Sequence, residues 1–271
     1  MDVFFVIFAI VLASVLGVIS IPLSRYIQII EDNVQCGKCD KKADCFAQKP
    51  FLIGKNNWVD EFMLFSFCRV RKYCNYTTGD YKKKYIIYFV FSIILALIPF
   101  WSKGINTSSI CFGISSAMLL ALGVVDWNTQ YIPLEYTLVI TICGLIHLFA
   151  DFSNWVEYLI GLLAVSGFLC IVNLIGTPIL KKKYQEEDLN SVIGDGDIKL
   201  MAATGLLLGW KLNFIALGIG CVIGSVIHIF RMRIKGSESI FALGPYLSLG
   251  VYITMICGEQ LVGWYLKMLG V

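Results

Sequence analysis

The stretch Asp126-Trp-Asn-Thr-Gln-Tyr-Ile-Pro133 separates two apolar segments, residues 108–125 and 134–150. A second stretch, Gly194-Asp-Gly-Asp-Ile-Lys-Leu200, opens a further apolar segment at 198–210. Each stretch therefore places an aspartate at the edge of an apolar run. A carboxylate beside a bilayer is costly unless it is solvated, paired or used in chemistry, so both stretches indicate a functional site.

The composition predicts an all-α polytopic membrane protein. Of the 271 residues, 58% are hydrophobic and only 15% are charged, whereas soluble domains carry about 25% charged residues. The first apolar segment lacks the basic start of a signal peptide and is interpreted as a retained anchor. About eight transmembrane helices are expected, over residues 3–23, 85–101, 108–125, 134–150, 156–180, 198–210, 212–230 and 240–266.

The basic residues predict the orientation of these helices. If the loops alternate from an N-terminus outside the cell, 19 of the 22 Lys and Arg residues fall on the cytoplasmic side. This bias follows the positive-inside rule, so both aspartate stretches are expected at the cytoplasmic face of the membrane. The net charge of +3 is too small to indicate a nucleic-acid partner, and membrane lipid is the expected surrounding.

Three regions are expected: a first transmembrane helix at 1–23, a cytoplasmic cysteine-rich domain at 24–84, and a transmembrane domain at 85–271. About sixty residues rarely form a stable core without a staple. Because a reducing cytosol disfavours disulfides, metal binding is the leading interpretation of the cysteines, with structural Zn²⁺ as the expected metal. The expected ligands are Cys36, Cys39, Cys68 and Cys74, with Cys45 as an extra thiol.

The two aspartates together suggest a membrane-embedded aspartic protease. Peptide hydrolysis by carboxylates needs one ionised group to activate water and one protonated group to polarise the scissile carbonyl. Asp126 and Asp197 are the candidates. Gly194 and Gly196 are expected to permit unusual backbone dihedrals and close approach of another chain. A helix is expected to start just after Asp197, and Lys199 to reach the interface or add positive potential.

Other interpretations remain open for these residues. Asp126 can simply end a helix that Ile132 and Pro133 restart, and the glycine-rich stretch can be an ordinary turn. A proton-coupled transporter would also use paired aspartates, although such proteins often show internal repeats and midplane carboxylates. A third possibility is a zinc-bound scaffold whose 24–84 loop recruits partners.

The chain resembles the bacterial type IV prepilin peptidase family, whose aspartates occur in D-x5-[LI]-P and G-x-G-D-x-K. Asp126 with Ile132-Pro133 matches the first pattern, and Gly194-Asp-Gly-Asp197-Ile-Lys199 matches the second. Residues 201–210 and 241–250 also resemble the family, so the similarity covers about 110–271. The resemblance implies that Asp126 and Asp197 are the catalytic pair. It implies that the substrates are prepilin or pseudopilin precursors of pilus or secretion systems.

The N-terminal part resembles the family less. Bifunctional members carry two C-x-x-C pairs and also methylate the new N-terminus with S-adenosylmethionine. Cys36-Gly-Lys-Cys39 matches one pair, but Cys68 and Cys74 are separated by five residues instead of two. The resemblance therefore leaves N-methyltransferase activity open.

Overall fold

The computed structural model describes residues 3–20, 82–184, 191–235, 242–268 and 270. Within these ranges the regular elements are all helical, as the composition predicted. They are α1 (Val3–Val18), α5 (Lys82–Lys103), α6 (Thr107–Thr129), α7 (Leu134–Ala150), the short 3₁₀ helix η2 (Phe152–Asn154), α8 (Trp155–Tyr184), α9 (Asp195–Leu208), α10 (Trp210–Lys235) and α11 (Gly244–Met268). Each of the expected apolar segments contributes one α-helix.

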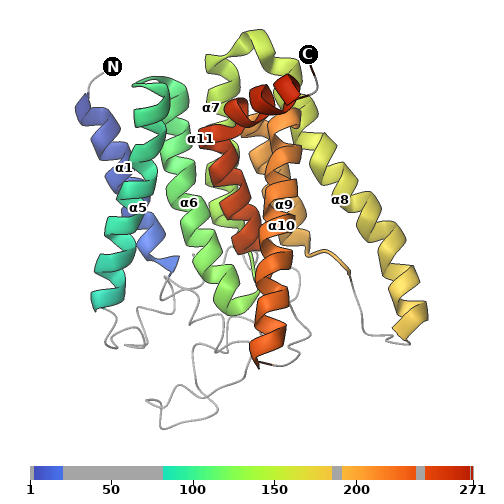
Figure 1. Ribbon diagram of the computed structural model, residues 1–271. Coiled ribbons are helices and arrows are strands. Elements are labelled where there is room, and N and C mark those ends of the chain that lie inside the picture. Colours follow the sequence, from blue (N-terminus) through green and yellow to red (C-terminus); the bar gives the residue numbers. More distant parts are fainter. Residues whose placement is uncertain (1–2, 21–81, 185–190, 236–241, 269, 271) are drawn as a thin grey trace, which may run out of the picture.

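Four spans in the described residues are long and apolar enough to cross a membrane: Ile86–Lys103, Thr107–Thr129, Phe152–Lys182 and Trp210–Arg233. Their outer faces carry exposed aliphatic side chains such as Leu163 and Val222. Exposed apolar faces of this extent are typical of helices that contact lipid. The start of α1 and the end of α11 lie at the same end of the bundle (Figure 1).

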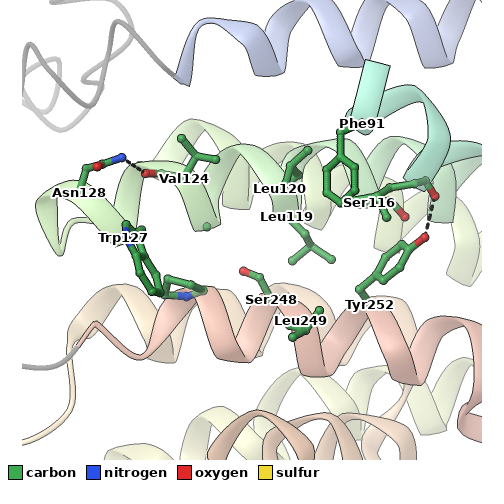
Figure 2. A pocket seen from close by; sticks show the side chains of 13 residues that line it. Phe91, Ser116, Leu119, Leu120, Val124, Trp127, Asn128, Ser248, Leu249 and Tyr252 are labelled. Carbon is green, nitrogen blue, oxygen red and sulfur yellow. Dashed lines mark hydrogen bonds between the residues drawn. The ribbon is translucent and has the colours of Figure 1, made fainter. Parts of the chain in front are cut away.

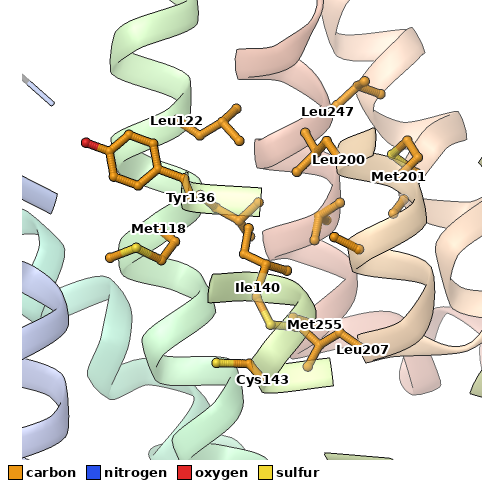
Figure 3. Packing of buried hydrophobic residues seen from close by; sticks show 14 of the residues in the cluster. Met118, Leu122, Tyr136, Ile140, Cys143, Leu200, Met201, Leu207, Leu247 and Met255 are labelled. Carbon is orange, nitrogen blue, oxygen red and sulfur yellow. The ribbon is translucent and has the colours of Figure 1, made fainter. Parts of the chain in front are cut away.

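The central helix of the bundle is α6, which packs against α1, α5, α7 and α11. Most of its residues are buried, including Met118 and Leu122. They pack with Ile140 of α7, Leu200 of α9 and Leu247 of α11 in the main apolar core (Figure 3). The core thus joins the helices that carry the two aspartate motifs.

The short helix α9 is sheltered by protein. It has 14 residues, fewer than the roughly 20 that cross hydrocarbon. It packs against α7, α8 and α10, and Leu200, Met201 and Leu207 are fully buried. Such shelter makes a short segment tolerable at membrane depth. In Figure 1, α9 and α11 begin near the middle of the bundle, whereas α6, α8 and α10 extend further toward the opposite end.

Glycines bring the helices next to α9 and α11 into close contact. Gly161 of α8 and Gly205 of α9 face each other so closely that a Cβ on either would collide with the backbone carbonyl of the other. Gly250 of α11 packs in the same way against Gly220 of α10, where a Cβ on Gly250 would lie 2.7 Å from the Gly220 nitrogen. Small residues of this kind allow close helix packing in lipid.

A buried polar pair also links α9 to α10. Thr204 Oγ1 donates to Asn213 Oδ1 at 3.0 Å, and Asn213 Nδ2 donates to the Met201 carbonyl at 2.8 Å. Asn213 is fully buried. Because buried polar groups need such partners, this network fixes the position of α9 against α10.

Candidate active site

Asp126 lies in the last turn of α6 and is buried. The helix ends when Gln130 adopts a left-handed conformation with φ of 54°, and its backbone N–H donates to the Asp126 carbonyl at 2.8 Å. The Asp126 carboxylate accepts a hydrogen bond from the backbone N–H of Gly244, at the start of α11. Asp126 is therefore held by α6 and oriented by α11, so helix termination is not its only structural role.

Asp197 lies in the first turn of α9, which begins at Asp195, three residues earlier than expected. Gly194 is the N-cap residue, and the Asp197 N–H donates to its carbonyl at 3.0 Å. Asp197 is buried, with 8% of its surface exposed. The positive end of the helix dipole favours negative charge at this position.

The structure brings the two aspartates to one cavity of about 360 Å³. Their carboxylates interact electrostatically across it. Asp126 Oδ2 and Asp197 Oδ1 are buried and have no hydrogen-bond partner among the described residues. Since buried polar atoms are normally paired, these two oxygens retain hydrogen-bonding capacity that the described residues do not use. The cavity is lined by Asp126, Gln130, Tyr131, Ile132, Leu134, Gly194, Asp195, Gly196, Asp197 and Lys199.

Ile132 joins the two motifs. A Cβ on Gly196 would lie 2.7 Å from the Ile132 Cβ, and a Cβ on Gly244 would lie 3.1 Å from the Ile132 Cδ1. Any side chain at Gly196 would therefore push Ile132 and, with it, the segment that follows Asp126. The motif glycine is needed for this approach between two parts of the same chain.

The expectation of unusual backbone dihedrals at the motif glycines was wrong. Gly194 has φ of −62° and ψ of 135°, which other residues also adopt. Gly196 is helical, and the described glycines with positive φ are Gly104, Gly209 and Gly270. Close packing rather than backbone freedom explains the glycine at position 196.

The other predicted residues of this region also lie at the cavity or beside it. Pro133 is buried and forms the N-cap of α7, so the prediction that Ile132-Pro133 restarts a helix is confirmed. Lys199 is exposed and lines the cavity with both aspartates. Asp195 is exposed in the same cavity.

Sequence reasoning missed the role of Gly244. The residue belongs to a stretch whose similarity to the family was noted, but no contact with Asp126 was predicted for it. A glycine followed by Pro245 at the start of an apolar helix was the available signal. The left-handed conformation of Gln130 was also not predicted, because a non-glycine residue rarely adopts it.

The predicted zinc ligands Cys36, Cys39, Cys68 and Cys74 lie outside the described residues. The same holds for the boundary between the first helix and the cysteine-rich region. Both the metal site and the separate 24–84 domain therefore stay predictions. The described cysteines are Cys111, Cys143, Cys170, Cys221 and Cys257, all of them free thiols in helices.

A helical membrane protein with two buried carboxylates facing one cavity has the arrangement expected of an intramembrane aspartic peptidase. The model of the Type IV leader peptidase family matches residues 113–229, which include both aspartate motifs. Together with the relatives described next, this match supports the type IV leader peptidase family for this chain. The protein is a peptidase.

Relatives named prepilin leader peptidase/N-methyltransferase support this assignment. The relative from Legionella pneumophila is 26% identical over 204 residues, covering 73% of this chain and 67% of the relative. That from Stutzerimonas stutzeri is 25% identical over 249 residues, covering 91% and 79%. That from Aeromonas hydrophila is 29% identical over 152 residues, covering 55% and 50%. No solved structure gave a significant match.

Proposed function

We propose that this protein is a membrane-embedded aspartic endopeptidase that removes the leader peptide from type IV prepilin-like precursors, with Asp126 and Asp197 as its catalytic pair. The single observation that carries the assignment of residues is the shared cavity, which both buried aspartates line. Each aspartate also has a carboxylate oxygen without a hydrogen-bond partner among the described residues. The substrate class is supported by the printed names of the relatives.

The chemistry needs one proton between the two carboxyl groups. Two carboxylates in one site cannot both ionise readily, so the pair holds a single proton near neutral pH. The ionised group takes a proton from water as the water oxygen attacks the scissile carbonyl. The protonated group donates to the carbonyl oxygen and stabilises the tetrahedral intermediate. Breakdown of that intermediate breaks the C–N bond. The leaving nitrogen takes up the proton that the first carboxylate took from water, and the proton on the former carbonyl oxygen returns to the second carboxyl group.

The peptide reaches the aspartates from the end of the bundle toward which α6, α8 and α10 extend beyond the start of α9. The motif segment there is accessible, since Val192, Gly194 and Asp195 are exposed. A protease accepts its substrate in extended form, which main-chain contacts along an exposed segment would favour. By the distribution of basic residues, this end of the bundle faces the cytoplasm. The cut would then fall where a leader peptide meets the apolar helix that follows it.

The cysteine-rich segment 24–84 would bind one structural Zn²⁺ through Cys36, Cys39, Cys68 and Cys74. The metal would stabilise that segment, and the proteolytic chemistry would stay with the aspartates. Metal analysis of purified protein should therefore find about one zinc per chain, and chelation should leave cleavage in place. The printed names of the relatives also include N-methyltransferase. The geometry of the described residues supports the peptidase step.

The comparisons give no support to the proton-coupled transporter. Mutation distinguishes a scaffold from a peptidase, because a scaffold would keep its function after the loss of both aspartates.

The test uses purified protein in detergent or liposomes with a pilin-type precursor. Wild-type protein should cleave the precursor, whereas Asp126→Asn and Asp197→Asn should each leave it intact while the protein remains folded. Cleavage by both variants would refute the aspartyl mechanism.

A further inference from the structure

A second cavity, of about 390 Å³, opens on the side of the bundle between α5, α6 and α11 (Figure 2). Its lining is almost entirely apolar and includes Phe91 of α5, Leu120 of α6 and Leu249 of α11. Small residues at Gly123 and Ser248 leave room between the helices. We call this cavity the lateral groove.

The lateral groove and the candidate active site are lined by neighbouring residues of α6, and the groove is also lined by α11 next to Gly244. Trp127, which lines the groove, directly follows Asp126 on α6. Pro245, which also lines the groove, directly follows Gly244, whose N–H donates to the Asp126 carboxylate. On both α6 and α11, therefore, a residue that lines the groove is the sequence neighbour of a residue at the candidate catalytic centre.

The Ser248 hydroxyl distinguishes the groove from an ordinary lipid-facing surface. Ser248 is buried, with 5% of its surface exposed, and its Oγ has no hydrogen-bond partner among the described residues. Figure 2 shows the hydroxyl directed into the space between α6 and α11. Two other polar groups of the groove are paired: Ser116 Oγ donates to the Phe112 carbonyl at 2.7 Å, and Tyr252 Oη to the Leu95 carbonyl at 3.0 Å.

An unpaired buried hydroxyl favours an occupant that carries hydrogen-bonding groups. Lipid acyl chains have none, whereas a peptide segment offers backbone carbonyls and polar side chains. Small residues on helices also allow a further transmembrane helix to approach closely. We propose that the lateral groove binds the apolar segment of a membrane-anchored substrate, the part that follows the scissile bond. This inference rests on the proposed peptidase function.

The test compares two substrates: the full precursor in liposomes and a short peptide that spans the cleavage junction but lacks the apolar segment. Gly123→Leu fills the groove, since a Cβ there meets only Pro245, at 3.7 Å. The matched control is Gly218→Leu on α10, where a Cβ meets nothing within 4 Å. Gly123→Leu should raise the KM for the precursor about tenfold more than the KM for the short peptide. Gly218→Leu should change the ratio of the two KM values little.

A second measurement does not depend on turnover. In the Asp197→Asn background, a photo-crosslinking amino acid at Leu249 should capture the precursor through its apolar segment. The same group at Leu163, an exposed position on α8 outside the groove, should not. Crosslinks from Leu249 to lipid alone, or an equal rise of both KM values in Gly123→Leu, would overturn the groove assignment. If the wild-type protein cleaves neither substrate, the peptidase proposal itself fails.

Discussion

Gly244 lies so close to Asp126 that a Cβ atom on its backbone would stand 2.6 Å from Asp126 Oδ2. The same backbone donates its N–H to the Asp126 carboxylate. Gly244→Ala should therefore displace the carboxylate or the start of α11. A small misplacement of a catalytic group can lower the rate by about 100-fold, so we expect a loss of this order in kcat for precursor cleavage.

The control for this variant is Gly218→Ala, because the added methyl group meets open space. It should retain wild-type activity. Thermal unfolding of both variants in detergent separates the loss of geometry from the loss of fold. An active Gly244→Ala protein would show that the close approach at Asp126 is not required.

The second prediction separates two neighbouring aspartates. Asp197 is buried and interacts with Asp126, whereas Asp195 is exposed in the same cavity. Asp197→Asn should lower kcat by about 10²–10⁴-fold, the contribution typical of a general acid or base. Asp195→Asn should retain most of its activity. The reverse pattern, measured on the same precursor preparation, would show that the assignment is wrong.

The third prediction concerns pH. If hydrolysis needs one ionised and one protonated carboxyl group, the active form carries a single proton on the pair. Activity should fall at low pH, where both groups are protonated, and at high pH, where both are ionised. The profile of kcat/KM should therefore be bell-shaped. Asp195→Asn should keep this shape, and a flat profile across the range in which the protein stays folded would contradict the shared proton.

The sequence predicts the helices well, because each long apolar run has to form a helix in lipid to satisfy its backbone. The expected segment 108–125 corresponds to α6 at Thr107–Thr129, although the helix continues one turn past the predicted edge. Asp126 lies in that extra turn. The turn places the carboxylate inside a helix packed against α11 instead of in a loop.

The contacts that shape the site could not be predicted in the same way. Gly196 and Ile132 are 64 positions apart, and Gly244 and Asp126 are 118 apart. Hydropathy indicates which segments are buried but not which residues of two helices touch. The motifs identified the two aspartates because their chemistry is unusual beside a membrane. They carried no information on the glycines that pack against Asp126 and Ile132.

A further long-range contact fixes the segment that precedes α9. Asn173 of α8 accepts hydrogen bonds at its Oδ1 from the backbone N–H groups of Val192, at 2.9 Å, and Ile193, at 3.2 Å. These residues lead directly into Gly194, the N-cap of α9. Thr177 Oγ1 also donates to the Asn173 Oδ1 at 3.1 Å. The Asn173 side-chain oxygen thus links α8 to residues 192–193, the segment that leads into α9 and Asp197.

The last prediction follows from this contact. Asn173→Ala removes the acceptor and frees residues 192–193, so Asp197 should be held less firmly. Losing hydrogen bonds of about 1 kcal/mol each should lower kcat about tenfold, with little change in KM. Asn173→Asp keeps an acceptor oxygen at the same position and should restore most of the activity. Steady-state kinetics on the short junction peptide measure this effect apart from groove binding. Equal losses in Asn173→Ala and Asn173→Asp would show that the acceptor oxygen is not what holds Asp197 in place, because only the Asp variant keeps that oxygen.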